Sequence, residues 1–208
     1  VSGPLSGGKV TISGRKGSQL ISGLLMALPL SKKNSTLTVT NATSLPYIKL
    51  TLDVIRKFGI GIECEESDGD LVFNIPGKQN YTPASFAIEG DWSSASNFIV
   101  AGALFGDIII KGLNMESHQA DRAIVNIIRN CGGYIEEKNG SLRVKASHLR
   151  AFEYDATNSP DLFPVLAILA AFCEGESAIK GVDRLRTKES DRKESIMESL
   201  QKMGVKVE

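Results

Sequence analysis

The sequence predicts an α/β (α+β) fold built from repeated β-α-β-α-β-β units. Three similar phrases recur along the chain, and each contains an apolar helix end, a glycine and a strand with Ile or Val before Glu. Their glycines are Gly59, Gly132 and Gly204, which lie 73 and 72 residues apart. Because such even spacing is typical of a structural repeat, each phrase is interpreted as the same part of one unit.

The first unit is expected to alternate strands and helices and to close with a hairpin around a Ser-Asp-Gly-Asp turn. Ser44 is the expected N-cap of its second helix, and Pro46 is compatible with the first turn of that helix. The expected elements are strand 9–12, helix 18–28, strand 37–40, helix 45–58 and the hairpin strands 60–64 and 71–75.

The second and third units repeat this order. The second is expected to contain strand 85–88, helix 93–105, strand 108–111, helix 118–131 and hairpin strands 134–137 and 142–145. The third is expected to contain strand 152–154, helix 161–172, strand 177–180 and helix 188–203. It stops inside its hairpin, so we expect the natural chain to continue beyond Glu208.

The helices differ in their apolar pattern. The first helix of each unit is apolar nearly all round, which predicts burial, whereas the second has one apolar face and is expected to pack against a sheet. A polar segment with two prolines, residues 76–83, is the expected domain boundary. The sequence therefore predicts two domains, 1–83 and 84–208.

Composition excludes several classes of protein. Lys+Arg and Asp+Glu both number 24, so the chain has no basic field for nucleic acid or for an anionic membrane. The apolar runs are shorter than the roughly 20 residues of a membrane span. The widely spaced Cys64, Cys131 and Cys173 are interpreted as buried thiols, and His118 and His148 as surface residues that bind no metal. With no leader at the first residues, a cytoplasmic location is expected.

The stretch Lys188-Glu189-Ser190-Asp191-Arg192 is the strongest candidate for a functional site. It is expected to open the helix 188–203, with Thr187 as its N-cap. Lys188 and Arg192 would then share one face of the first turn, beside the positive end of the helix dipole. A bound anion would stabilise that arrangement, whereas a solvated mixed-charge helix start is the alternative.

Three further stretches combine polar side chains with a helix start. They are Gly17-Ser18-Gln19, Ser44-Leu45-Pro46-Tyr47 and the segment 158–164, which contains Asp161. Hydroxyls and N–H groups at a helix start are suited to a phosphate, and a partly buried Asp161 is suited to act as a general base. Ordinary helix capping is the alternative for the two serine stretches, with Tyr47 as a core residue. For Asp161 the alternative is a carboxylate stabilised by the helix dipole.

The residues 185–192 resemble the Lys-Glu-(Ser/Thr)-Asp-Arg signature of the EPSP synthase family, and the resemblance covers the whole chain. It implies a two-lobed, inside-out α/β barrel with helices inside and sheets outside, in which each lobe holds three units. This chain would supply about three of the six units. Residues 1–83 would be the last unit of the first lobe, on the shikimate 3-phosphate side. Residues 84–208 would be the first two units of the second lobe, which carry the catalytic residues.

The resemblance also implies roles for single residues. Gly17 replaces a family serine, so only its two neighbours carry over from that motif. The stretch Glu89–Ser96 is similar to a family motif as well, but helix capping explains it. The implied shikimate 3-phosphate ligands are Ser18, Gln19, Ser44, Tyr47, Asp161 and Lys188; Lys188 and Arg192 would bind phosphoenolpyruvate; Asp161, Glu189 and Lys188 would be catalytic.

The implied reaction transfers the enolpyruvyl group of phosphoenolpyruvate to the 5-hydroxyl of shikimate 3-phosphate, without metal or cofactor. We expect a monomer when the protein is full length, and no activity from these 208 residues alone. The alternatives are a UDP-N-acetylglucosamine enolpyruvyl transferase and a non-catalytic sugar-phosphate binding module. An RNA 3′-phosphate cyclase type would need a catalytic histidine, and neither His118 nor His148 stands in a suitable motif.

Overall fold

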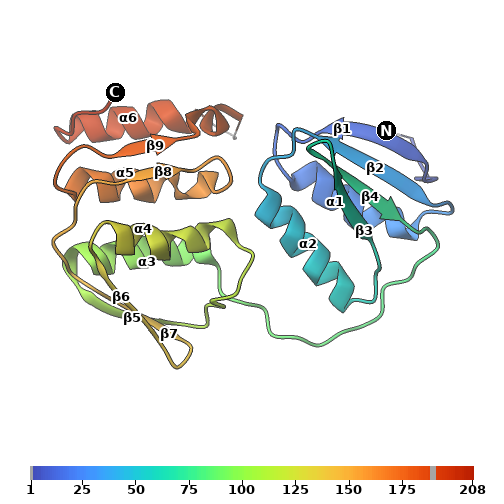
Figure 1. Cartoon of the computed structure of the whole chain (residues 1–208), viewed down its shortest axis with the longest axis horizontal. Helices are drawn as coiled ribbons and strands as arrows, with labels where there is room; N and C mark the ends of the chain where they lie inside the picture. Colours follow the sequence, from blue (N-terminus) through green and yellow to red (C-terminus); the bar gives the residue numbers. More distant parts are fainter. Residues whose placement is uncertain (1, 188–190) are drawn as a thin grey trace. The chain divides into compact units, whose positions relative to one another are not determined.

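Figure 1 shows the computed structural model of the chain, which describes residues 2–187 and 191–208. The chain divides into two compact units, Val1–Ala87 and Ile88–Glu208. The division falls after Ala87 rather than after Pro83 because Phe86 packs on the first unit. Its ring meets that of Phe58 edge-on, with centroids 5.6 Å apart, and the Nζ of Lys57 lies 5.0 Å from its centroid.

The first unit is a four-stranded sheet covered on one face by two helices (Figure 1). The strand order is β1-β2-β4-β3, in which β1 and β2 are parallel and the other pairs antiparallel. Alternate residues of β2 face the helices, and Leu37 and Val39 are fully buried. The elements are β1 (Lys9–Ser13), α1 (Gln19–Ala27), the 3-10 turn η1 (Leu28–Leu30), β2 (Ser35–Thr40), α2 (Leu45–Lys57), β3 (Glu63–Ser67) and β4 (Asp70–Ile75).

The second repeat keeps the same pairing without its first strand. Its sheet has the order β5-β7-β6, and both pairs are antiparallel. The expected strand 85–88 is wrong: those residues form no strand, and Ile88 is exposed. A 3-10 turn replaces the start of the expected helix 118–131. The elements are α3 (Trp92–Phe105), β5 (Asp107–Lys111), η2 (Ala120–Ala123), α4 (Ile124–Asn130), β6 (Tyr134–Lys138) and β7 (Ser141–Lys145).

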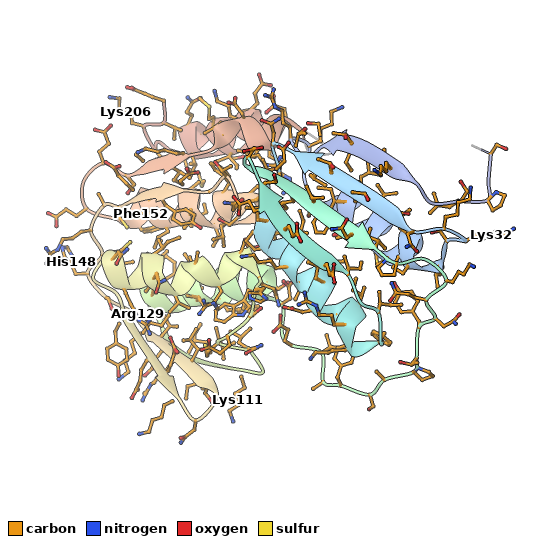
Figure 2. The ribbon with its side chains drawn as sticks, turned by 45° about the vertical axis from the view of Figure 1, so that its right-hand side comes forward. Lys32, Lys111, Arg129, His148, Phe152 and Lys206 are labelled. Atoms are coloured by element: carbon orange, nitrogen blue, oxygen red, sulfur yellow. The ribbon has the colours of Figure 1, made fainter. Side chains whose placement is uncertain are left out.

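The third repeat consists of a parallel strand pair and its helices. β8 and β9 pair as β1 and β2 do, and residues 205–208 form no strand, so the expected start of a hairpin there is wrong. Phe152, labelled in Figure 2, lies in the core that the second and third repeats share. The elements are β8 (Glu153–Asp155), η3 (Pro160–Leu162), α5 (Phe163–Phe172), β9 (Ala178–Lys180), η4 (Val182–Thr187) and α6 (Arg192–Lys202).

The apolar helices are only partly buried, contrary to expectation. One side of α1 packs in the core of the first unit through Ile21 and Leu25, but Leu20 on the same helix is 65% exposed. Phe98 of α3 and Ile168 of α5 are exposed as well. The described elements of each unit cover one face of these helices, which accounts for the difference.

The thiols and imidazoles are placed almost as expected. Cys131 is buried, and Cys173 is half-buried, but Cys64 is exposed because it lies on the edge strand β3. Both histidines are exposed, and Nε2 of His148, labelled in Figure 2, lies 2.9 Å from a carboxylate oxygen of Glu174. The described residues contain no His/Cys/Asp/Glu cluster that could hold a metal. In the same part of the chain, no helix has the length and apolar character needed to span a membrane.

Candidate functional site

The first part of the site lies where the parallel strands β1 and β2 end side by side. Ser13 and Thr40 are partners in the register, and the next amide, from Gly14, donates to the Thr40 carbonyl at 2.8 Å. Thr43 ties the second loop to the first, because its hydroxyl donates to the Gly14 carbonyl at 2.8 Å. Two helices therefore start close together, beyond the carboxyl ends of neighbouring strands, where α/β proteins bind ligands.

All four predicted ligands of the first unit lie on these two helix starts. Ser18 and Ser44 occupy the N-cap positions of α1 and α2, and Gln19 and Tyr47 follow them in the first turns. Neither serine hydroxyl makes a capping hydrogen bond, and Ser44 has the left-handed backbone φ of +57°. Ordinary N-capping therefore does not explain these hydroxyls. The structure brings the four predicted residues to one edge of the sheet.

Sequence reasoning missed two cations in the same place. Arg15 and Lys16 lie in the loop between β1 and α1 and are exposed. Two consecutive cations directly after a strand and before a Gly-Ser pair were the available signal. Together with helix N–H groups and hydroxyls, they make this edge of the first unit electropositive and suited to a phosphate.

The second part of the site uses the equivalent edge of the third repeat. Asp155 and Lys180 end the parallel pair β8 and β9, and the Ala156 amide donates to the Lys180 carbonyl at 3.0 Å. Gly181 packs closely here, since an added Cβ would lie 2.7 Å from the Thr157 nitrogen. The turns η3 and η4 follow these two strands.

Asp161 and Arg192 meet at this edge. Asp161 is the second residue of η3, and Arg192 is the first residue of α6. Arg192 Nη1 donates to Asp161 Oδ1 at 2.8 Å, and the two side chains are 33% and 37% exposed. Residues 31 positions apart in the sequence are thus brought into one charge-assisted contact that remains open to ligands.

The turn η4 carries another cation toward the same carboxylate. Leu185 is buried and packs with Phe163 and Ala156, which fixes η4 on α5. Burial lowers the pKa of the neighbouring Arg184, and the negative charge of Asp161 acts in the opposite direction. Asp161 therefore lies within the electrostatic reach of two arginines.

The expected start of the last helix is corrected. The helix α6 begins at Arg192, and its N-cap is Asp191, whose carboxylate accepts from the Glu194 amide at 3.2 Å. Thr187 is the last residue of η4. The predicted residues Lys188 and Glu189 lie outside the described residues. The chain itself thus supplies an anion at this helix start, through Asp191.

Solved structures with similar folds define a class of protein. An EPSP synthase structure from Acinetobacter baumannii matches with a TM-score of 0.71 at 22% identity, over 95% of this chain and 45% of that chain. The enolpyruvyl transferase NikO from Streptomyces tendae matches with a TM-score of 0.62 at 19% identity, over 85% of this chain and 45% of that chain. The fold is therefore that of enolpyruvyl transferases.

The chain belongs to the EPSP synthase family. The sequence model of that family, described as EPSP synthase (3-phosphoshikimate 1-carboxyvinyltransferase), matches residues 1–208. A 3-phosphoshikimate 1-carboxyvinyltransferase from Archaeoglobus fulgidus is 41% identical over 99% of this chain and 48% of its own length. One from Methanococcus maripaludis strain C6 is 38% identical over all of this chain and 49% of its own length. The chain spans about half the length of the curated relatives it matches.

Proposed function

We propose that the complete protein transfers the enolpyruvyl group of phosphoenolpyruvate to the 5-hydroxyl of shikimate 3-phosphate and releases phosphate. The observation that carries this proposal is the contact between Arg192 and Asp161, an anion-binding cation and a carboxylate at the same edge of a parallel strand pair. The names of the relatives support the same reaction.

The first unit would bind the phosphate of shikimate 3-phosphate. Ser18 and Ser44 place hydroxyls at the two helix starts, and Gln19 adds an amide. Tyr47 stands one turn into α2, where its ring can lie against a cyclic substrate. The turn of α2 that carries it is tied to α1, because the Thr51 hydroxyl bonds both the Tyr47 carbonyl, at 2.9 Å, and the Ser22 hydroxyl, at 2.8 Å.

The second unit would carry out the proton transfers. Asp161 removes the proton of the 5-hydroxyl as the oxygen bonds to C2 of phosphoenolpyruvate, and Glu189 delivers a proton to C3. Breaking the bond from C2 to the phosphate oxygen, with loss of a proton from C3, then restores the double bond. Arg192 would grip the carboxylate of phosphoenolpyruvate, and Lys188 would stabilise the developing charge.

The test uses two conservative variants of the complete protein. Asp161→Asn keeps the shape and removes the base, so kcat should fall about a hundredfold while the KM for shikimate 3-phosphate changes little. Arg192→Lys keeps the charge and loses the two-pronged grip, so the KM for phosphoenolpyruvate should rise about tenfold. The assay is phosphate release from the two substrates.

Arg129→Lys is the matched control, because Arg129 makes an exposed ion pair with Glu137 at 2.7 Å in another repeat. Its kinetics should equal those of wild type. Wild-type kcat in Asp161→Asn would remove Asp161 from the mechanism. Wild-type KM values in Arg192→Lys would show that Arg192 does not bind substrate.

A further inference from the structure

The second unit also contains a buried carboxylate. Asp121 in η2 has no solvent-exposed surface, and it accepts a hydrogen bond from the Ser93 hydroxyl at the start of α3. Burying a carboxylate is costly unless hydrogen bonds or charges compensate. Asp91 already caps α3 through the amides of Ser93 and Ser94, so helix capping does not account for Asp121.

A pair of hydroxyls lies at the turn that carries Asp161. The Tyr154 hydroxyl on β8 lies 2.7 Å from the Ser159 hydroxyl, and Ser159 is 1% exposed. Burial raises the pKa of Tyr154, the Ser159 contact lowers it, and the negative charge of Asp121 raises it again. The phenol therefore lies in an apolar environment, within the field of the buried carboxylate.

Ser159 is the N-cap residue of η3, two positions before Asp161. Its amide donates to the Ala156 carbonyl at 3.1 Å, and its carbonyl accepts from the Leu162 amide at 3.1 Å. The turn is thus held through the amide and the carbonyl of Ser159, and through the contact of its hydroxyl with Tyr154. Any rotation of Ser159 would move the carboxylate of Asp161.

We propose that Tyr154 and Ser159 are positioning residues that hold η3 and so direct the Asp161 carboxylate. This inference depends on the proposed function, in which Asp161 is the base. Tyr154 is the member best suited to a test, because its hydroxyl can be removed while its ring stays in the core.

The first experiment measures the position of Asp161 without any assay of activity. In the 208-residue chain, Tyr154→Phe should shift the carboxyl 13C resonance of Asp161 and the side-chain Nε–H resonance of Arg192. Tyr134→Phe is the control, because its exposed phenol bonds Glu136 at 3.1 Å in another sheet. The inference fails if Tyr154→Phe leaves both resonances where Tyr134→Phe leaves them.

The second experiment uses the complete protein. Tyr154→Phe should lower kcat about tenfold or more, with both KM values within about twofold of wild type, because a misplaced base slows the chemical step. Ser159→Ala combined with Tyr154→Phe should cost less than the product of the single effects, since residues in direct contact are not additive. Fully multiplicative effects would overturn the coupling between the two residues.

The two experiments separate this inference from the proposed function. Shifted resonances with an unchanged kcat would support the positioning of Asp161 and count against Asp161 as the base. Unchanged resonances would overturn the positioning even if Asp161→Asn abolished turnover.

Discussion

Gly14 determines how closely the two loops of the first-unit site approach each other. It is buried between β1 and α1, and an added Cβ would lie 2.7 Å from the Ala42 Cα and 3.0 Å from a methyl group of Val39. The Ala42 neighbour is backbone and cannot rotate away. A side chain at position 14 would therefore separate the loop that carries Ser18 from the loop that carries Ser44.

We predict that Gly14→Ala destabilises the chain by about 1–3 kcal/mol, the usual cost of overpacking, and weakens binding of inorganic phosphate. The measurements are chemical denaturation and a phosphate titration followed by NMR. The control is Gly23→Ala in α1, where a Cβ would meet nothing within 4 Å. That change should stabilise the chain by about 0.5–1 kcal/mol. Equal effects from both substitutions would contradict the crowding at Gly14.

Single residues could be predicted from the sequence when their role depends on position along the chain. Ser18, Ser44 and Asp161 follow strand ends and precede helical turns, and the structure places them there. The contact from Arg192 to Asp161 could not be predicted, because it depends on how η3 and α6 pack, and the two residues are 31 positions apart in the sequence. The left-handed backbone of Ser44, with a φ of +57°, was likewise not predicted.

At the scale of the element, the helix starts divide into two kinds. Asp91 caps α3 and Asp191 caps α6 through their carboxylates, whereas Ser18 and Ser44 make no capping bond at α1 and α2. The carboxylate caps stabilise their helices directly through the orphan N–H groups and the helix dipole. Ser18 and Ser44, which make no capping bond, stand at the two helix starts where we propose that phosphate binds.

The cap of α3 should give a pH-dependent stability. Hydrogen bonds from Ser94, first, and from Ser93 lower the pKa of Asp91 below its ordinary value. A lowered pKa in the folded state stabilises the fold above the unfolded pKa of about 4, and this contribution is lost as the pH falls through the folded-state value. Asp91→Asn keeps a neutral cap that does not titrate.

We predict that wild type is more stable than Asp91→Asn by a few tenths of a kcal/mol up to about 1 kcal/mol at pH 7. The difference should shrink toward zero as the pH falls through the lowered folded-state pKa of Asp91. Comparing the two proteins by urea denaturation at each pH cancels the titration of all other groups. A difference that stays constant from pH 7 to pH 2.5 would show that the charge of Asp91 contributes nothing.

The start of α6 shows that the exact boundary of an element could not be predicted from the sequence. The two cations at positions 188 and 192 favoured a helix from 188, with Thr187 as its cap. In the structure the aspartate at 191 is the cap and the helix begins one residue later. Asp and Thr are both good N-cap residues, so residue type alone does not decide between them. The apolar period of the helix and its end at Gly204, whose φ is +82°, were predictable.

At the scale of the whole molecule, the repeat explains how the strands pair but not how many strands each sheet has. The strand order β2-β4-β3 recurs as β5-β7-β6, and the parallel pair β1 and β2 recurs as β8 and β9. The expected strand 85–88 does not form. A local sequence pattern does not reveal whether a segment can pair with the edge of a sheet. Burial of α1, α3 and α5 was overestimated for a similar reason, since an all-apolar helix does not show which neighbours cover it.

The boundary between the units gives the last prediction. The segment 76–83 was expected to be the linker, but hydrogen bonds attach it to the first unit. The Gln79 side chain bonds the Gly61 amide at 2.8 Å and the Pro76 carbonyl at 2.7 Å, and the Tyr81 hydroxyl donates to the Met26 carbonyl at 2.8 Å. Residues 82–88 are exposed, and Ile88 is 87% exposed.

Thermolysin, which cleaves before large apolar residues, should therefore cut first before Phe86 or Ile88 and leave the two units as separate fragments. Cleavage needs local opening, which is easiest where few contacts hold the backbone. Gln79→Ala removes the bonds to Gly61 and Pro76, so a second early cut should appear near Tyr81 in that variant alone. Mass spectrometry of the first fragments identifies each site. A first cut inside α3 or α5 in wild type would contradict the division into these two units.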